Sequence, residues 1–123
     1  MLFDTSVLIA HLRNVPEATE LLLRSAMEGA AFVSVLSRVE VEGGMRSSER
    51  AIVAQLFGRL RLEPVTDPIA AQAASYARSY RRSHRGIDAF DYVIAATSEI
   101  LEQPLATLNV KHFPMFKRLR PAF

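Results

Sequence analysis

Short apolar runs alternate with helical segments along this 123-residue chain, and that alternation constrains the fold more than any other feature. Strands are expected at Leu2-Phe3, 31–35, 61–65 and 105–108, with a weaker fifth near Leu119. Strands that alternate with helices predict an α/β three-layer sandwich, in which helices flank a mainly parallel sheet of four to five strands. No repeat or linker interrupts the pattern, so one domain over 1–123 is expected.

Proline, glycine and capping residues mark the expected helix boundaries. Pro16 opens a helix that Gly29 ends, and Asp67 followed by Pro68 is the pattern of an N-cap and a first helical position. These signals and the apolar spacing predict six helices. Three of them begin just after the first strand, at Pro16 and at Ser37, and the other three cover 48–60, 69–84 and 88–101. A short helix or turn is expected near 111–113.

The composition excludes several classes of protein. Half of the residues are hydrophobic and 23% are charged, which is typical of a globular protein. The chain has no cysteine, so it has no disulfide, thiolate metal site or cysteine nucleophile. No apolar run approaches the ~18–20 residues that span a bilayer. Only three residues precede Asp4, the first candidate functional residue, so no signal peptide is expected before it. A cytoplasmic protein without membrane contact is expected.

Arginine dominates the basic residues, at thirteen of fifteen, and the sequence pI is about 9.4. Five basic residues cluster before the acidic pair at 88 and 91: Arg78, Arg81, Arg82, His84 and Arg85. A solvated surface explains an arginine bias by itself, but the planar guanidinium also suits phosphate oxygens and RNA bases. A basic segment that leads into acids is the arrangement a polyanion-cleaving site needs.

Asp4 comes directly after the first apolar run, in Leu2-Phe3-Asp4-Thr5-Ser6. It has two interpretations. As a structural residue it caps the following helix. As a functional residue it lies at the carboxyl end of a strand, where α/β folds place their ligands.

Glu40 also has two interpretations. Ser37-x-x-Glu40 is the pattern of a capping box, in which the glutamate bonds back to the N-cap amide. The alternative is that its carboxylate joins a site with other acids. Glu42 lies about 200° further round the helix and is expected in solvent.

Asp88 and Asp91 lie three residues apart at the start of an expected helix, so their carboxylates share nearly one face. One acid suffices for a cap, and two exceed that need. Asp91 is the better ligand because it lies deeper in the helix, and Asp88 is an N-cap or a supplementary ligand. Acids that converge form an oxygen-only pocket, which suits Mg²⁺ or Mn²⁺.

Four segments carry a resemblance to a known family: Leu-Phe-Asp-Thr-Ser-Val-Leu-Ile at the start, 34–44, 91–97 and 107–113. In this order and spacing they resemble the PIN-domain ribonucleases, most closely the VapC toxins of type II toxin–antitoxin pairs. The resemblance implies that Asp4, Glu40 and Asp91 bind metal. It further implies polar support from Thr5, Ser6, Thr107 and Asn109, and RNA contacts from Arg81, Arg82, Arg85 and Lys111.

One departure from the family pattern concerns its fourth acid. Asn109 and His112 occupy the two positions where that acid occurs, so a second metal site is in doubt unless Asp88 compensates.

The implied function is a Mg²⁺- or Mn²⁺-dependent endoribonuclease toxin that cuts tRNA or rRNA loops and leaves 5′-phosphate ends. The implied partners are a VapB-type antitoxin and a second copy of the chain in a homodimer. Three alternatives remain open at this point: a non-catalytic PIN-like interaction module, a DNA nuclease, and an Asp-nucleophile phosphatase. The phosphatase is disfavoured because Ser6 stands where its second Asp belongs.

Overall fold

The computed structural model describes residues 1–123 and contains one parallel sheet of four strands in the order β3-β2-β1-β4. The strands are short: β1 (Leu2–Phe3), β2 (Phe32–Ser34), β3 (Arg61–Glu63) and β4 (Leu105–Ala106). In register, Leu2 lies opposite Phe32 and Leu105, and Phe32 lies opposite Arg61. The predicted parallel sheet is confirmed with four strands.

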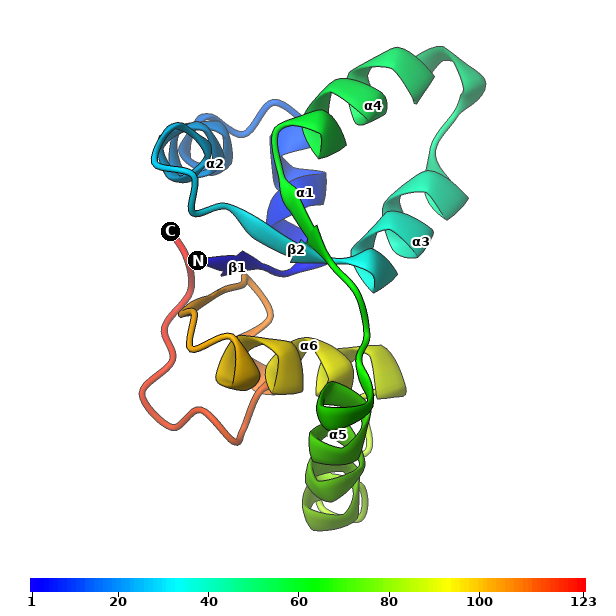
Figure 1. Ribbon diagram of the computed structural model, residues 1–123, viewed down its shortest axis with the longest axis vertical. Helices are drawn as coiled ribbons and strands as arrows, with labels where there is room; N and C mark the ends of the chain where they lie inside the picture. The colour runs from blue at the N-terminus through cyan, green and yellow to red at the C-terminus, as the bar shows by residue number, and fades with distance from the viewer.

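Six α-helices connect and cover these strands: α1 (Thr5–Leu12), α2 (Pro16–Met27), α3 (Val35–Gly44), α4 (Arg50–Gly58), α5 (Asp67–Tyr80) and α6 (Ala89–Ile100). Two 3₁₀ turns, η1 (Ser47–Glu49) and η2 (Val110–His112), complete the elements. Helices α1 to α4 lie on one side of the sheet and α5 and α6 on the other, so the three-layer α/β prediction is confirmed (Figure 1). None of the helices is both long and apolar enough to cross a bilayer.

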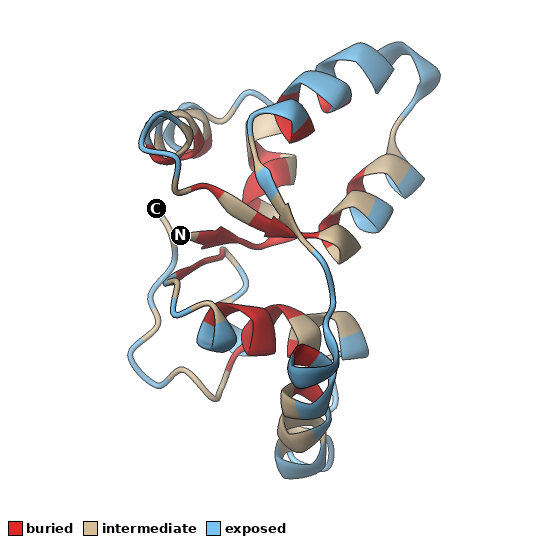
Figure 2. Ribbon diagram, viewed as in Figure 1, coloured by how far each residue is buried: buried red, intermediate tan, exposed pale blue.

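The two faces of the sheet have separate cores because successive strand residues point in opposite directions. Phe3 joins the cluster under α1 to α4, together with Val7, Leu8 and Val33. Its neighbour Leu2 joins the other cluster, which includes Ile94 of α6. The buried residues accordingly lie along the strands and on the inner sides of the helices (Figure 2). The sheet therefore separates α3 from α6 (Figure 1).

Several predicted boundaries were wrong. Helix α3 begins at Val35, because the Ser34 hydroxyl is the cap and accepts a hydrogen bond from the Leu36 amide at 3.2 Å. Helix α5 is likewise capped by Thr66, whose hydroxyl accepts from the Ile69 amide at 3.4 Å, so Asp67 lies in the first turn.

Three other differences involve turns. The segment predicted as a helix over 48–60 begins as a 3₁₀ turn and becomes α-helical at Arg50, and α5 ends at Tyr80 rather than at 84. No strand forms near Leu119, because its amide donates to the Phe116 carbonyl within a turn at 3.1 Å.

The Ser34 cap gives a first test of the fold. Replacing Ser34 with Ala should lower the free energy of unfolding by about 1 kcal/mol, because the Leu36 amide loses the buried hydroxyl that accepts its hydrogen bond. Chemical denaturation measures the loss, and the exposed Ser48→Ala provides the control. Equal stability of the two variants would contradict the assignment of the cap.

Candidate metal-binding active site

Asp4 is the buried centre of the candidate site, with 4% of its surface exposed. Its amide donates to the Ala106 carbonyl at 2.9 Å, which holds the residue at the carboxyl edge of the sheet between β1 and β4. Asp4 occupies the N-cap position of α1, yet its side chain makes no capping bond. Its carboxylate Oδ2 instead accepts from the hydroxyls of Ser6 at 2.9 Å and Thr107 at 2.7 Å. The capping interpretation of Asp4 is therefore wrong.

The two hydroxyls that bind Asp4 are themselves fixed by backbone amides. Leu108 N–H donates to Ser6 Oγ at 3.0 Å, and Asn109 N–H donates to Thr107 Oγ1 at 2.9 Å. Because each oxygen already accepts an N–H, its own proton is directed at the carboxylate. The other carboxylate oxygen of Asp4, Oδ1, accepts no hydrogen bond from the protein.

Glu40 of α3 approaches the same edge and is held by α1. The Thr5 hydroxyl lies 2.9 Å from the Ser37 hydroxyl and donates to Glu40 Oε1 at 2.7 Å. The predicted Ser37–Glu40 capping box is wrong, because both residues lie inside α3. Partial burial raises the pKa of Glu40, the Thr5 hydrogen bond opposes the rise, and the charges of Asp4 and Asp88 add to it.

Asp88 and Asp91 form one reciprocal capping box at the start of α6. Asp91 N–H donates to Asp88 Oδ1 at 3.0 Å, and Asp88 N–H donates to Asp91 Oδ2 at 3.2 Å. Asp88 is the N-cap, as one of its two interpretations held. The argument that two acids exceed the needs of a cap was wrong, because this motif uses both.

Asp91 is the most perturbed acid of the group. Burial raises its pKa from the ordinary 3.8 to about 6, against the hydrogen bond from Asp88 N–H. The charges of Asp88 and Asp4 contribute to this rise in the pKa, while His112, whose Nδ1 lies 3.3 Å from Asp91 Oδ2, opposes it. Only 15% of the Asp91 side chain is exposed, so water compensates its charge poorly.

The predicted convergence of the acids is only partly present. Asp4 is close enough to Glu40 and Asp91 for its charge to raise both pKa values. However, no three acidic or histidine side chains lie close enough together to hold one ion. Glu40 is turned toward Thr5, and Asp91 toward Asp88 N–H and His112. The oxygen donor set fits a hard divalent cation, and side-chain rotation is needed to close it.

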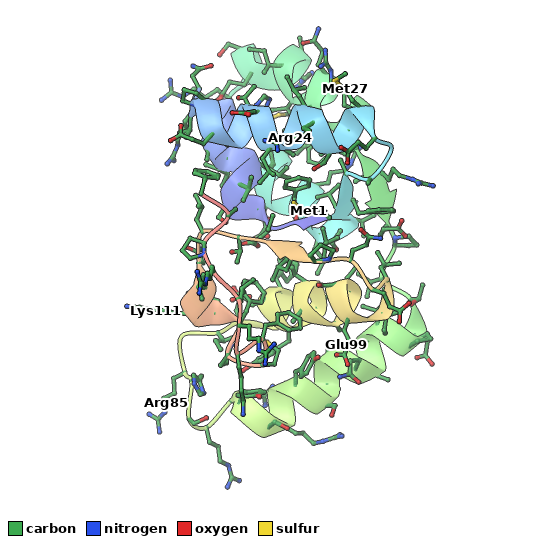
Figure 3. All side chains as sticks on the ribbon, turned by 90° about the vertical axis from the view of Figure 1, so that its left-hand side faces the viewer. Met1, Arg24, Met27, Arg85, Glu99 and Lys111 are labelled. Atoms are coloured by element: carbon green, nitrogen blue, oxygen red, sulfur yellow. The ribbon has the colours of Figure 1, made fainter.

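The predicted RNA-binding residues are basic and lie on the surface. Arg81, Arg82, Arg85 and Lys111 are all exposed, and none of them forms an ion pair within the protein. Arg85 and Lys111 project from the same edge of the molecule, and Glu99 near the other end of α6 lies at the opposite edge (Figure 3). Asn109 is exposed, and its side chain makes no hydrogen bond.

Sequence reasoning missed two members of the site. Ser37 is fully buried beside Thr5, and its signal was mistaken for a capping box. His112 was noted only as a substitute for an acid, whereas it lies beside Asp91. His112 reaches Asp91 because η2 packs near the start of α6, and no local sequence pattern predicts that packing.

Comparison with known proteins adds independent information. The model of the PIN domain family matches residues 1–119. Ribonuclease VapC10 of Mycobacterium tuberculosis is 47% identical over 123 residues, covering 100% of this chain and 92% of that protein. Ribonuclease VapC19 of the same organism is 42% identical over 123 residues, covering 99% and 98%.

Two solved structures share the fold. A toxin-antitoxin complex from Klebsiella pneumoniae superimposes with a TM-score of 0.79 at 21% identity, covering 99% of this chain and 97% of that chain. FitAcB from Neisseria gonorrhoeae superimposes with a TM-score of 0.70 at 25% identity, covering 91% and 89%.

The raised pKa of Asp91 predicts a pH-dependent gain of stability in Asp91→Asn. A carboxyl whose pKa is higher in the folded state stabilises the fold below about pH 3.8, and this contribution is lost as the pH rises to about 6. With a chelator present, Asp91→Asn should therefore raise the free energy of unfolding by about 1 kcal/mol above pH 6, and it should leave it unchanged at pH 3.5. The figure includes a reduction for the residual solvent contact of the side chain.

Denaturation of both proteins between pH 3.5 and 7 measures this difference. The exposed Glu102→Gln is the control, for which no such rise is expected. A stability difference between Asp91→Asn and the unmodified protein that stays constant with pH would contradict the perturbed pKa.

Proposed function

We propose that this chain, which belongs to the PIN-domain family and within it to the VapC ribonucleases, cuts RNA with a divalent cation held by Asp4, Glu40 and Asp91. The protein is an endoribonuclease of the toxin class, as its curated relatives are named ribonucleases. The proposed cation is Mg²⁺ or Mn²⁺, and Asp88 is its supplementary ligand.

One observation supports the cation most strongly. Asp4 keeps one carboxylate oxygen free of protein hydrogen bonds beside two acids whose pKa values its charge raises. Such a group lacks positive charge, and perturbed acids of this kind are concentrated at functional sites. When bound, a divalent cation neutralises charge on the scissile phosphate and makes water more acidic.

The residues of the chain have distinct roles in this proposal. Ser6 and Thr107 keep Asp4 Oδ2 occupied, so Oδ1 would be the oxygen available to hold the cation. Thr5 restrains Glu40 and releases it when the carboxylate turns inward. Asn109 offers its unbonded amide to water at the rim, where its side chain is exposed.

Exposed basic side chains supply the RNA contacts in this proposal. Arg81, Arg82, Arg85 and Lys111 lie where phosphates on either side of the cut need neutralising. The substrate class is a single-stranded loop of tRNA or rRNA, because unstacked loops expose both their linkages and their bases. In-line attack by water leaves a 5′-phosphate.

Two partners complete the proposal: a VapB-type antitoxin and a second copy of this chain. A groove of about 680 Å³ lies between α1 and the α3–α4 region, and its lining includes Glu40 together with Ile9, Leu12, Val41 and Met45. We assign this groove to a C-terminal antitoxin segment whose arginine pairs with the site carboxylates. The related toxin-antitoxin complex has the same fold.

A non-catalytic PIN-like interaction module is the second candidate. Asn109 in place of the family's fourth acid favours it, as do the acids that do not converge on one point. Such a module would leave RNA intact with either cation.

Asp4→Asn should abolish Mg²⁺- or Mn²⁺-dependent cleavage, because the amide cannot supply the central negative charge. Asn retains an oxygen for the two hydroxyls, so thermal unfolding should shift little. Cleavage of a panel of structured RNAs, read by 5′-end mapping, measures the loss. The control is Glu42→Gln, outside the site, which should cut normally. Undiminished cleavage by Asp4→Asn would refute the assigned site, and no cleavage by the unmodified protein would favour the interaction module.

Arg85→Ala and Lys111→Ala should each weaken RNA binding regardless of sequence. Each loses one phosphate contact, so the slope of log K against log[salt] should fall in magnitude by about 0.7. Binding is measured on the inactive Asp4→Asn background from 50 to 300 mM salt. Arg24→Ala on α2, which lies at the other end of the molecule, is the control (Figure 3). An unchanged slope in both test variants would exclude these residues from the RNA path.

A further inference from the structure

Beside the acidic group, a hollow of about 290 Å³ lies between α5 and the first turns of α6. Its walls are mostly apolar and include Ala73, Ala77, Ile87 and Val93. A second hollow of about 590 Å³ shares Ala74, Ala77 and Arg81 with it. The second lies within the size range of small-ligand pockets, about 300–1,000 Å³, and the first is close to its lower limit.

Tyr92 lines the first hollow and carries an unsatisfied polar group. The residue is 3% exposed, and its hydroxyl is the only buried side-chain polar atom in the chain without a hydrogen-bond partner. Buried polar groups are nearly always paired, because loss of water without a replacement bond is costly. The oxygen is closed to solvent, so a ligand with a polar edge would become its partner only when the Tyr92 side chain turns toward the hollow.

Arginine defines the charge of the region. Arg78, Arg81 and Arg82 line the second hollow, and none of them forms an ion pair or side-chain hydrogen bond. No acidic residue lines either hollow. The matching ligand therefore combines a flat apolar body, a polar edge and negative charge, which is the chemistry of a nucleotide.

We propose that this hollow binds one base of the RNA, in the nucleotide next to the scissile phosphate, and sets base preference there. Ala89, Tyr92 and Val93 line it from the side of α6 that faces α5, and Asp88 and Asp91 occupy the adjoining side of the same first turns. A strand whose phosphate lies at Asp91 thus reaches the hollow with its neighbouring base. Tyr92 turns its buried Oη toward the base edge when the base enters, and Arg81, which also lines the hollow, neutralises the phosphate of that nucleotide. The inference rests on the proposed ribonuclease function.

Two variants test the hollow in different ways. Ala74→Leu fills it from an exposed position, and Tyr92→Phe removes only the hydroxyl. Ala71 lies on the same helix, is exposed and lines neither hollow, so Ala71→Leu is the matched control. Each protein cuts a library of single-stranded RNAs with one randomised position on either side of the cut, with Mg²⁺ or Mn²⁺.

The unmodified protein and Ala71→Leu should prefer one base at one flanking position. Tyr92→Phe should reduce that preference about 3- to 10-fold, the worth of one hydrogen bond. Ala74→Leu should abolish the preference and weaken binding about 10-fold, while cutting continues. Unchanged preference in Ala74→Leu overturns the proposal and leaves the ribonuclease function standing. The proposal is also overturned if that variant changes only the oligomeric state, which would assign the hollow to a second copy.

Failure of the proposed function has a different signature. If the unmodified protein cuts nothing, nucleoside monophosphates are titrated instead, and the Tyr92 ring resonances are followed by NMR. Shifts in the unmodified protein that Ala74→Leu abolishes support a base pocket without catalysis. An absence of shifts overturns the base pocket as well.

Discussion

The candidate site depends on the burial of the Asp4 carboxylate at the junction of β1 and β4. A buried carboxylate is tolerated only when it is well hydrogen-bonded or neutralised. Two hydroxyls satisfy one of its oxygens, and backbone amides that follow β4 orient both of them. Residues separated by about a hundred positions thereby fix one oxygen and leave the other open. The parallel pairing of β1 and β4 produces this arrangement, since both strands end at the same edge.

The acids around Asp4 repel one another, and this repulsion destabilises the folded state. Burial and neighbouring charges raise the pKa values of Glu40 and Asp91, and local partners hold their carboxylates apart: Thr5 for Glu40, and Asp88 N–H with His112 for Asp91. The hydrogen bonds from Thr5 and from Asp88 N–H satisfy the separated carboxylates without adding positive charge, and His112 adds an ion-pair contact to Asp91. A cation would relieve this repulsion, because opposite charges attract strongly where water is scarce, as it is around the buried Asp4. The same carboxylates are therefore stable in two arrangements: bonded to their local partners, as in this structure, and turned toward a cation, as in the proposed function.

Sequence alone predicted the sheet and the position of Asp4 because both follow from short-range pattern. Leu2 and Phe3 are apolar on both faces, which marks a buried parallel strand, and Asp-Thr-Ser marks its end. Cap positions were less predictable, since Ser34 and Ser37, or Thr66 and Asp67, are chemically equivalent candidates. Backbone geometry decided between them: Ser34 and Thr66 are extended, whereas Ser37 and Asp67 are already helical. The contacts of Ser37 with Thr5 and of His112 with Asp91 are tertiary, and no local signal specifies them.

The segment between α5 and α6 links the two parts of the proposed RNA surface. Arg81, Arg82 and Arg85 lie at its start, and it ends in the Asp88–Asp91 capping box. The capping box fixes the direction in which the segment enters α6, and Ile87, just before it, lines the hollow with Tyr92. One local motif thus sets the distance between the acids that would cut and the pocket that would read the adjacent base. A shift of the α6 cap would therefore alter cleavage and base preference together, whereas the filling of the hollow would alter preference alone.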